Sequence, residues 1–273
     1  MTNRLAFRRA VTLSATAVTI TLLCGSALAQ NRAPAPASAA PAPKCTIPPD
    51  IARFELPLTR FSIRLAAGLP IKIVAIGSSS TFGTGASAPD KSYPSQLKVE
   101  LEHHFPGQPV SVVNRGVGGE ESTDMLARFE TGVIAEHPHL VIWQVGTNAL
   151  LRDRPLDPRA VALHRGIARL QANRSDIVLM DPQYAPNVLA KTNRDATVAQ
   201  IAQTAREEGI GLLRRYEMMR HWHEVEHLPF ETFVTADGLH MNDWGYACLA
   251  KLLGIAIAEA AIRPRETAAA PNR

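Results

Sequence analysis

A run of serines and a distant Asp–His pair are the residues of this sequence best suited to chemistry. The serines at 78–80 follow the apolar run 71–76, while Asp237 and His240 stand close together near the C-terminus. A serine hydroxyl is a weak nucleophile until a neighbouring base takes its proton, and histidine suits that task near neutral pH. A carboxylate can hold the histidine tautomer and stabilise the imidazolium. The pattern therefore predicts a serine hydrolase.

Two further residues could stabilise the negative charge that develops when a serine attacks a carbonyl carbon. Gly119 lies in a glycine-rich turn and offers a backbone N–H, and Asn148 offers a side-chain amide just after a predicted strand. Such donors form an oxyanion hole. Each residue also has an ordinary structural explanation, because glycine serves tight turns and asparagine caps helices.

The elements that must position these residues follow from the hydrophobic pattern. Short, nearly continuous apolar runs, typical of strands covered on both faces, predict strands at 71–77, 110–114, 140–145, 177–181 and 210–214. Apolar residues at helical spacing predict helices at 93–104, 122–135, 159–172, 192–208 and 242–259. This alternation predicts an α/β fold with a parallel sheet and right-handed crossovers.

Polar clusters lie at or near the ends of four of the predicted strands. They occupy residues 78–80, 114–120, 146–148 and 181–183. In a parallel sheet, ligands bind beyond the carboxyl ends of the strands, near the point where the strand order switches. The four clusters are therefore expected to face one rim and to form a single site.

Four ordered blocks resemble those of the SGNH, or GDSL-type, hydrolases. They read GSSST at 77–81, NRGVGG at 114–119, GTN at 146–148 and DGLH at 237–240. The resemblance implies a three-layer α/β/α, flavodoxin-like fold with a five-stranded parallel sheet. It also implies hydrolysis of acyl esters without a metal. We expect the substrate to be an acyl or acetyl ester of a small molecule or a glycan, and we expect no cofactor.

The resemblance also implies a role for each matched position. Ser79 corresponds to the nucleophile and His240 to the base, with Asp237 as the partner of the base. The oxyanion hole would consist of the Ser79 N–H, the Gly119 N–H and the Asn148 side chain.

The sequence departs from the family pattern at the nucleophile block. Ser78 stands where GDSL proteins have an aspartate, so the hydrogen bonds around the serine loop must be rearranged. The elbow motif G-x-S-x-G of α/β-hydrolases is absent, because Thr81 occupies its last position.

A competing motif suggests a different enzyme class. His223, Glu224 and His227 fit the pattern H-E-x-x-H, in which two histidines on one helical face bind zinc while the glutamate activates water. Pro229 follows shortly afterwards, which limits the length of any helix there. A zinc metallopeptidase is therefore an alternative hypothesis.

Two other interpretations concern binding. Residues 218–227 could form a lid-like segment near the rim, in which His221 and Trp222 line the pocket for the acyl or leaving group. The chain could also be a non-catalytic glycan-binding protein on the same fold. Its aromatic share of 5% argues against an extended platform for stacking sugar rings.

The N-terminal residues predict export. Residues 1–29 carry three arginines, an apolar stretch and the sequence Ala27-Leu28-Ala29, which together are typical of a signal peptide. We expect an Ala/Pro-rich spacer at 30–50, the hydrolase domain at 51–263 and a tail at 264–273. The apolar stretch falls short of the ~20 residues that span a bilayer, so no stable membrane anchor is expected. The protein is then periplasmic or secreted.

Charge and cysteine content limit the partners further. The 29 basic residues nearly balance the 25 acidic ones once the three signal arginines are removed, which argues against a nucleic-acid partner. Removal of the signal leaves Cys45 and Cys248 as a pair. In an oxidising compartment they could form a disulfide, or they could remain two buried thiols.

Overall fold

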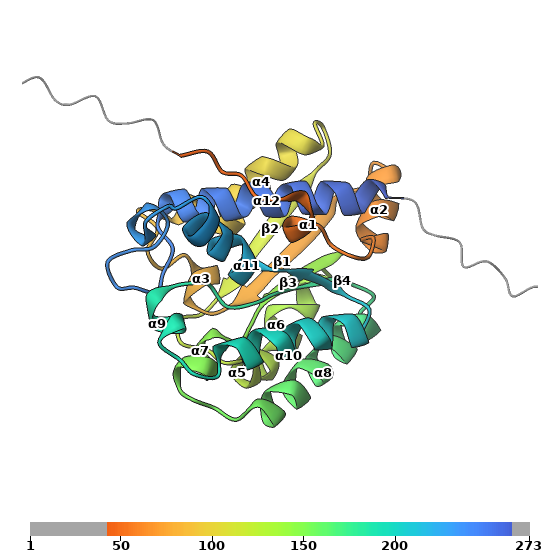
Figure 1. The fold of residues 1–273 in the computed structure, drawn as a ribbon. Coiled ribbons are helices and arrows are strands. Elements are labelled where there is room, and N and C mark those ends of the chain that lie inside the picture. Colours follow the sequence, from red (N-terminus) through yellow and green to blue (C-terminus); the bar gives the residue numbers. More distant parts are fainter. Residues whose placement is uncertain (1–42, 264–273) are drawn as a thin grey trace, which may run out of the picture. The chain divides into compact units, whose positions relative to one another are not determined.

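Five parallel strands form the sheet of the computed structural model, which describes residues 43–263 (Figure 1). The strands are β1 Ile71–Gly77, β2 Val110–Gly116, β3 Leu140–Gln144, β4 Asp176–Met180 and β5 Gly211–Leu213. Their order is β2-β1-β3-β4-β5, which places the switch point between β1 and β3. The predicted sheet is confirmed. The predicted signal peptide, most of the spacer and the tail at 264–273 lie outside the described residues.

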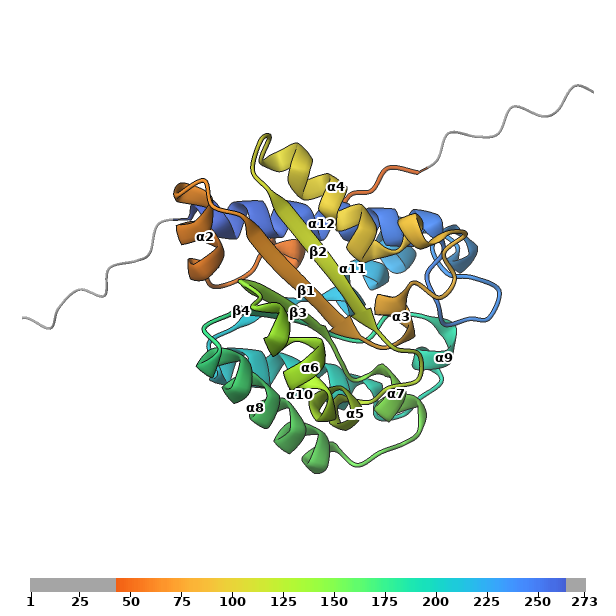
Figure 2. The same ribbon diagram turned by 180° about the vertical axis from the view of Figure 1, so that it is seen from behind.

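Helices cover both faces of this sheet, which confirms the predicted three-layer architecture (Figures 1 and 2). One face carries α1 Pro49–Ala52, α2 Thr59–Ala66, α4 Tyr93–His104, α11 Arg215–Arg220 and α12 Asp243–Ile262. The other face carries α5 Ser122–Ala127, α6 Phe129–Gly132, α8 Leu156–Ala172 and α10 Arg194–Glu207. Three short helices lie together at one end of the sheet: α3 Ser79–Phe82, α7 Thr147–Leu151 and α9 Pro186–Leu189.

The central strand β1 explains why its sequence is continuously apolar. Ile73 and Ala75 point into the core beneath α4 and α12, whereas Val74 and Ile76 point into the core beneath α5 and α8. All four side chains are fully buried. Successive side chains of a strand face opposite sides, so a strand covered on both faces needs apolar residues at every position.

Some helices differ from their predicted bounds. The helix expected at 122–135 is divided into α5, α6 and a 3₁₀ turn at Ile134–Glu136. The first break falls at Arg128, whose φ of -108° and ψ of 13° leave the helical range. Helices α1, α2 and α9 were not predicted, because each is too short for a clear period.

Helix α12 is the one helix in the described part of the chain that is long and apolar enough to cross a membrane. Two thirds of its most apolar window, 67%, is buried inside the protein, and its residues contribute to the core shared with α4. Its N-terminus is capped by Asn242, whose side chain accepts a hydrogen bond from Gly245 N at 3.0 Å. We therefore assign α12 as a core helix.

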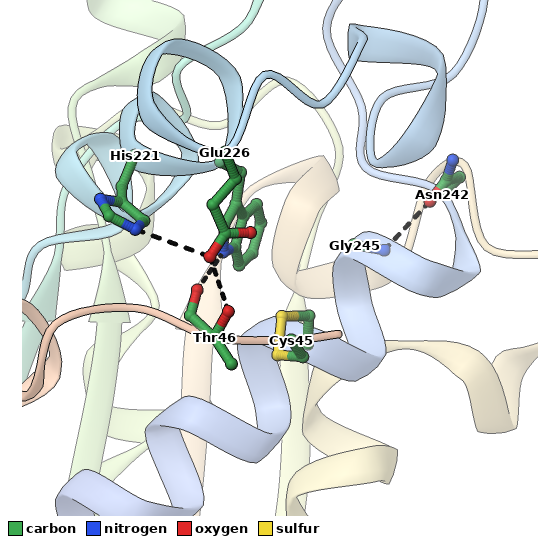
Figure 3. Close-up of a disulfide and its surroundings, with 8 residues drawn as sticks. Cys45, Thr46, His221, Glu226, Asn242 and Gly245 are labelled. Carbon is green, nitrogen blue, oxygen red and sulfur yellow. Dashed lines mark hydrogen bonds and ion pairs between the residues drawn. A yellow bond between two sulfur atoms is a disulfide. The ribbon is translucent and has the colours of Figure 1, made fainter. Parts of the chain in front are cut away.

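A disulfide joins the segment before α1 to α12 (Figure 3). Cys45 and Cys248 have a Cα–Cα distance of 5.4 Å, which settles the alternative that the sequence left open. The next residue, Thr46, accepts a hydrogen bond from Trp222 Nε1 at 3.2 Å and donates one to Glu226 Oε1 at 2.6 Å. The N-terminal segment is thus attached to both α12 and the chain that follows α11.

Candidate active site

Ser79 is held at the carboxyl end of β1, where the chain turns directly into α3. Ser78 occupies the N-cap position and Ser79 is the first helical residue, so its N–H has no partner within the helix. The turn requires glycine at Gly77, because a Cβ there would lie 2.1 Å from Thr81 Oγ1. The turn from β1 into α3 therefore has no room for a side chain at this position.

The structure brings Ser79, His240 and Asp237 into one hydrogen-bonded chain. His240 Nε2 lies 2.9 Å from Ser79 Oγ, and His240 Nδ1 lies 2.5 Å from Asp237 Oδ2. An Nδ1–H donated to the carboxylate leaves Nε2 free to accept the serine proton. Sequence reasoning therefore placed these three residues together correctly.

The Asp237 carboxylate is held by several donors from its own loop. Its Oδ1 accepts hydrogen bonds from Thr235 Oγ1 at 2.7 Å, from Leu239 N at 2.9 Å and from His240 N at 3.0 Å. Burial alone would raise the pKa of Asp237, but the bonds from His240, Thr235 and Leu239 outweigh it and hold the pKa well below the usual range. The carboxylate is therefore ionised at any pH at which a histidine could act as a base.

Two backbone N–H groups and one side-chain amide hydrogen in the neighbouring turns have no hydrogen-bond partner among residues 43–263. The N–H groups of Ser79 and Gly119 donate to no acceptor among the residues that the structure describes. Asn148 Nδ2 donates one bond to Glu120 O at 2.8 Å, which fixes the amide next to Gly119 and leaves its second N–H unused. The parallel pairing of Gly77 with Gly116 brings the Ser79 and Gly119 turns together. The arrangement can stabilise an oxyanion.

A buried glutamine holds Ser78, the residue that stands where GDSL proteins have an aspartate. Gln144 Oε1 accepts hydrogen bonds from Ser78 N at 2.7 Å and from Ser78 Oγ at 3.0 Å, with Thr81 Oγ1 at 3.4 Å. Gln144 is the last residue of β3 and is almost completely buried. Sequence reasoning missed it, although a polar residue closing the apolar run 140–144 was a signal.

Asn114 attaches α3 to the neighbouring strand. Its Nδ2 donates to Thr81 O at 2.8 Å, and its Oδ1 accepts from Gly116 N at 2.8 Å. Gly116 has no space for a side chain, because a Cβ there would lie 2.1 Å from Phe82 N. The block NRGVGG thus holds α3 in place.

The H-E-x-x-H segment does not have the geometry that a zinc motif requires. Its π-helical turn ends at Val225, and His227 lies beyond it with a left-handed φ of 56°. His223 Nδ1 donates to Leu228 O, while Glu224 accepts a bond from Tyr184 Oη at 2.6 Å. The two histidines therefore do not share a helical face. Within residues 43–263, no group of three or more His, Cys, Asp or Glu side chains is placed to hold a metal.

The expectation that Trp222 lines a substrate pocket is wrong. Trp222 is fully buried and packs against Phe233 and Trp244 in the core. His221 is turned toward Glu226, with its Nε2 3.6 Å from Glu226 Oε1, beside the disulfide (Figure 3). The segment after α11 anchors the N-terminal chain.

Comparisons with known proteins identify relatives of this chain. Residues 44–263 match the model of the Non-GDSL lipase-like family. An arylesterase from Vibrio mimicus is 29% identical over 127 residues, which cover 46% of this chain and 62% of the arylesterase. The chain thus spans less than two thirds of that relative.

Two solved structures share the fold. A two-domain esterase active on acetylated mannans, solved with mannopentaose, has a TM-score of 0.69 at 18% identity, covering 80% of this chain and 58% of the other. An acetylxylan esterase from Geobacillus stearothermophilus has a TM-score of 0.59 at 22% identity, covering 71% of this chain and 97% of the other. With the family match over most of its length, the chain belongs to the Non-GDSL lipase-like family.

Proposed function

We propose that this protein is an exported hydrolase of carboxylic esters that uses Ser79, His240 and Asp237 as a catalytic triad. The observation that carries the proposal is the hydrogen-bonded chain from Ser79 Oγ through His240 to Asp237. Three N–H groups in the neighbouring turns have no partner among the described residues. The family and the arylesterase relative support the expected enzyme class.

The reaction follows from the positions of these atoms. Ser79 Oγ attacks the ester carbonyl carbon while its proton passes to His240 Nε2, and Asp237 stabilises the imidazolium. The tetrahedral intermediate collapses as His240 returns the proton to the leaving alcohol oxygen, which leaves the acyl group on Ser79. Water, deprotonated by His240, then attacks the acyl-enzyme. The acyl–Oγ bond breaks, His240 returns the proton to Ser79 Oγ, and the acid is released.

The carbonyl oxygen becomes negative in both steps and needs donors that are already in place. The N–H groups of Ser79 and Gly119 and the free amide hydrogen of Asn148 fill this role. Because they make no competing bonds within the described chain, they can bind the oxyanion without first breaking an internal contact.

The substrate class proposed here is a short acyl ester, including acetyl groups on polysaccharides. Two exposed apolar side chains, Phe82 and Val117, stand on the segments that carry Ser79 and Gly119 and offer a small apolar contact for the ester. The acetylated mannan and acetylxylan substrates of the structural neighbours support the glycan-borne case. The signal-like residues 1–29 and the disulfide support export to an oxidising compartment.

Hydrolysis of p-nitrophenyl acetate by wild type, Ser79→Ala and Ser80→Ala tests the proposal. Ser80 is the matched control, because it is the next residue along the chain and its side chain is hydrogen-bonded to Tyr246. We expect Ser79→Ala to lose at least about 10³-fold in kcat, while Ser80→Ala stays within about tenfold of wild type. Equal rates for wild type and Ser79→Ala would refute the triad. Absence of hydrolysis by wild type, together with glycan binding, would favour the non-catalytic alternative.

A further inference from the structure

The loop that carries Asp237 and His240 accepts hydrogen bonds from the segment 183–187, which follows β4. Three successive carbonyls of the loop accept hydrogen bonds from residues that follow β4. Asn187 Nδ2 donates to Asp237 O at 3.0 Å and Asn187 N donates to Gly238 O at 3.0 Å. Gln183 Nε2 donates to Leu239 O at 3.1 Å. The sequence predicted that the polar cluster at 181–183 lies at the rim of the site. No residue of this cluster belongs to the triad or to the oxyanion hole.

The Gln183 amide also contacts the opposite side of the site. Its Oε1 accepts from Thr147 Oγ1 at 2.9 Å and from Arg215 Nη2 at 2.9 Å. Two donors on Oε1 fix the orientation of the amide, so that Nε2 must face Leu239. Thr147 precedes Asn148, and Leu239 precedes His240. One side chain therefore connects the oxyanion donor to the catalytic base.

The position of Gln183 is itself rigid. The side chain is 1% exposed, and Arg215 is completely buried. Arg215 Nε donates to Asp181 O at 3.0 Å, and Tyr216 N donates to Asp181 Oδ1 at 2.9 Å. These bonds tie the start of α11 to the end of β4, so Gln183 transmits the position of the sheet to the loop 237–240.

We propose that Gln183 is a positioning residue. It keeps His240 within hydrogen-bond reach of Ser79 and fixes the position of His240 relative to Asn148. This inference rests on the proposed function, because it assigns Gln183 to the same reaction. The side chain touches no reacting atom. Its effect is on the placement of the base, to which rates respond steeply, since a shift of about 1 Å can cost about 10²-fold.

The variant Gln183→Glu removes one contact and spares the others. The carboxylate keeps two acceptors for Thr147 and Arg215, and the buried guanidinium balances the new charge. It has no N–H for Leu239 O, so only the bond to the catalytic loop is lost. We expect kcat to fall about 10- to 100-fold, with KM within about threefold of wild type.

The matched control is Gln200→Glu. Gln200 Nε2 likewise donates to a backbone carbonyl of another element, Leu156 O at 3.0 Å, but it lies on α10. We expect this control to keep kcat within about twofold of wild type.

A second test variant, Asn187→Ala, changes an exposed residue and leaves no buried gap. It should lower kcat about threefold to tenfold.

Hydrogen exchange measured on the peptide covering 237–242 gives a readout that needs no substrate. Gln183→Glu should speed exchange of this peptide about tenfold or more, and Gln200→Glu should not. Unchanged exchange, or a kcat loss equal to that of the control, would overturn the positioning role. If Ser79→Ala kept full activity, the proposed function would fail, and the hydrogen-exchange measurement would still test whether Gln183 positions the loop. If Ser79→Ala were inactive and Gln183→Glu fully active, only this inference would fail.

Discussion

Gln144 Oε1 accepts a hydrogen bond from the backbone N–H of Ser78 at 2.7 Å, so the last residue of β3 sets the position of the turn that carries Ser79. Gln144→Leu would leave this buried N–H without an acceptor, at a cost of about 1–3 kcal/mol in unfolding free energy. We also expect kcat to fall, because Ser79 follows directly. Urea unfolding and ester hydrolysis measure both effects. Ser78→Ala, which loses only the hydroxyl contact, should cost less than about 1.5 kcal/mol. An equal loss in the two variants would contradict this account.

Asn148→Ala tests the oxyanion donor. Loss of one such donor typically lowers kcat by about 10²–10³ with little change in KM, because the bond strengthens as charge develops on the oxygen. Steady-state kinetics on p-nitrophenyl acetate measure the change. Asn173→Ala serves as control, since that amide bonds only Ser175 Oγ, at 3.0 Å, within its own turn. A loss expressed wholly in KM would show that Asn148 binds the ground state instead.

Asp237→Asn should lower kcat by about 10³–10⁴, because the amide cannot stabilise the imidazolium or hold its tautomer in the same way.

The lowered pKa of Asp237 also gives a stability prediction. A group with a depressed folded-state pKa stabilises the protein above its unfolded pKa of about 3.9, and this contribution is lost as pH falls further. The Tm difference between wild type and variant should therefore be constant from about pH 5 to 8 and shrink below about pH 4. A difference that changes between pH 5 and 8 would argue against the lowered pKa.

The contribution of Asp181 to stability should depend on pH in the opposite direction to that of Asp237. Burial raises its pKa to about 7, against the bond from Tyr216 N and the charge of Arg215. The folded protein then binds a proton that the unfolded chain releases near about pH 4, so this stabilisation is lost as pH rises from about 4 to 7. Asp181→Asn removes the titration. Its Tm relative to wild type should rise between about pH 5 and 8, as thermal melts at several pH values would show; a constant difference would contradict the raised pKa.

The disulfide gives a prediction on stability. Replacing Cys45 and Cys248 together by serine should lower the unfolding free energy by about 2–5 kcal/mol, chiefly by freeing the unfolded chain. Denaturant unfolding with and without reductant measures this. Reductant should move the wild type toward the double variant and leave the variant unchanged. Coincident midpoints for all four samples would mean that the bridge adds no stability.

The features that the sequence predicted are local ones. The strand at 71–77 followed from its continuous apolar run, and the pairing of Asp237 with His240 followed from their spacing within one loop. The ends of parallel strands meet at one edge, so the sequence alone predicts that Gly119 and Asn148 lie at the same rim.

The features that the sequence did not predict depend on distant partners. Gln144 and Gln183 act through contacts with elements far along the chain, and nothing near either residue identifies those contacts. Trp222 was misassigned for the same reason, since its burial depends on Phe233, Trp244 and Thr46. A short aromatic segment has the same appearance in a sequence whether it lines a pocket or fills a core.

Covalent labelling with a fluorophosphonate, located by mass spectrometry, tests most directly whether Ser79 is the nucleophile. We predict one added label on the peptide that contains Ser79, no label in Ser79→Ala, and much slower labelling in His240→Ala, because the base activates the hydroxyl. Ester hydrolysis by a wild-type protein that takes up no label, or a label on another residue, would contradict the account.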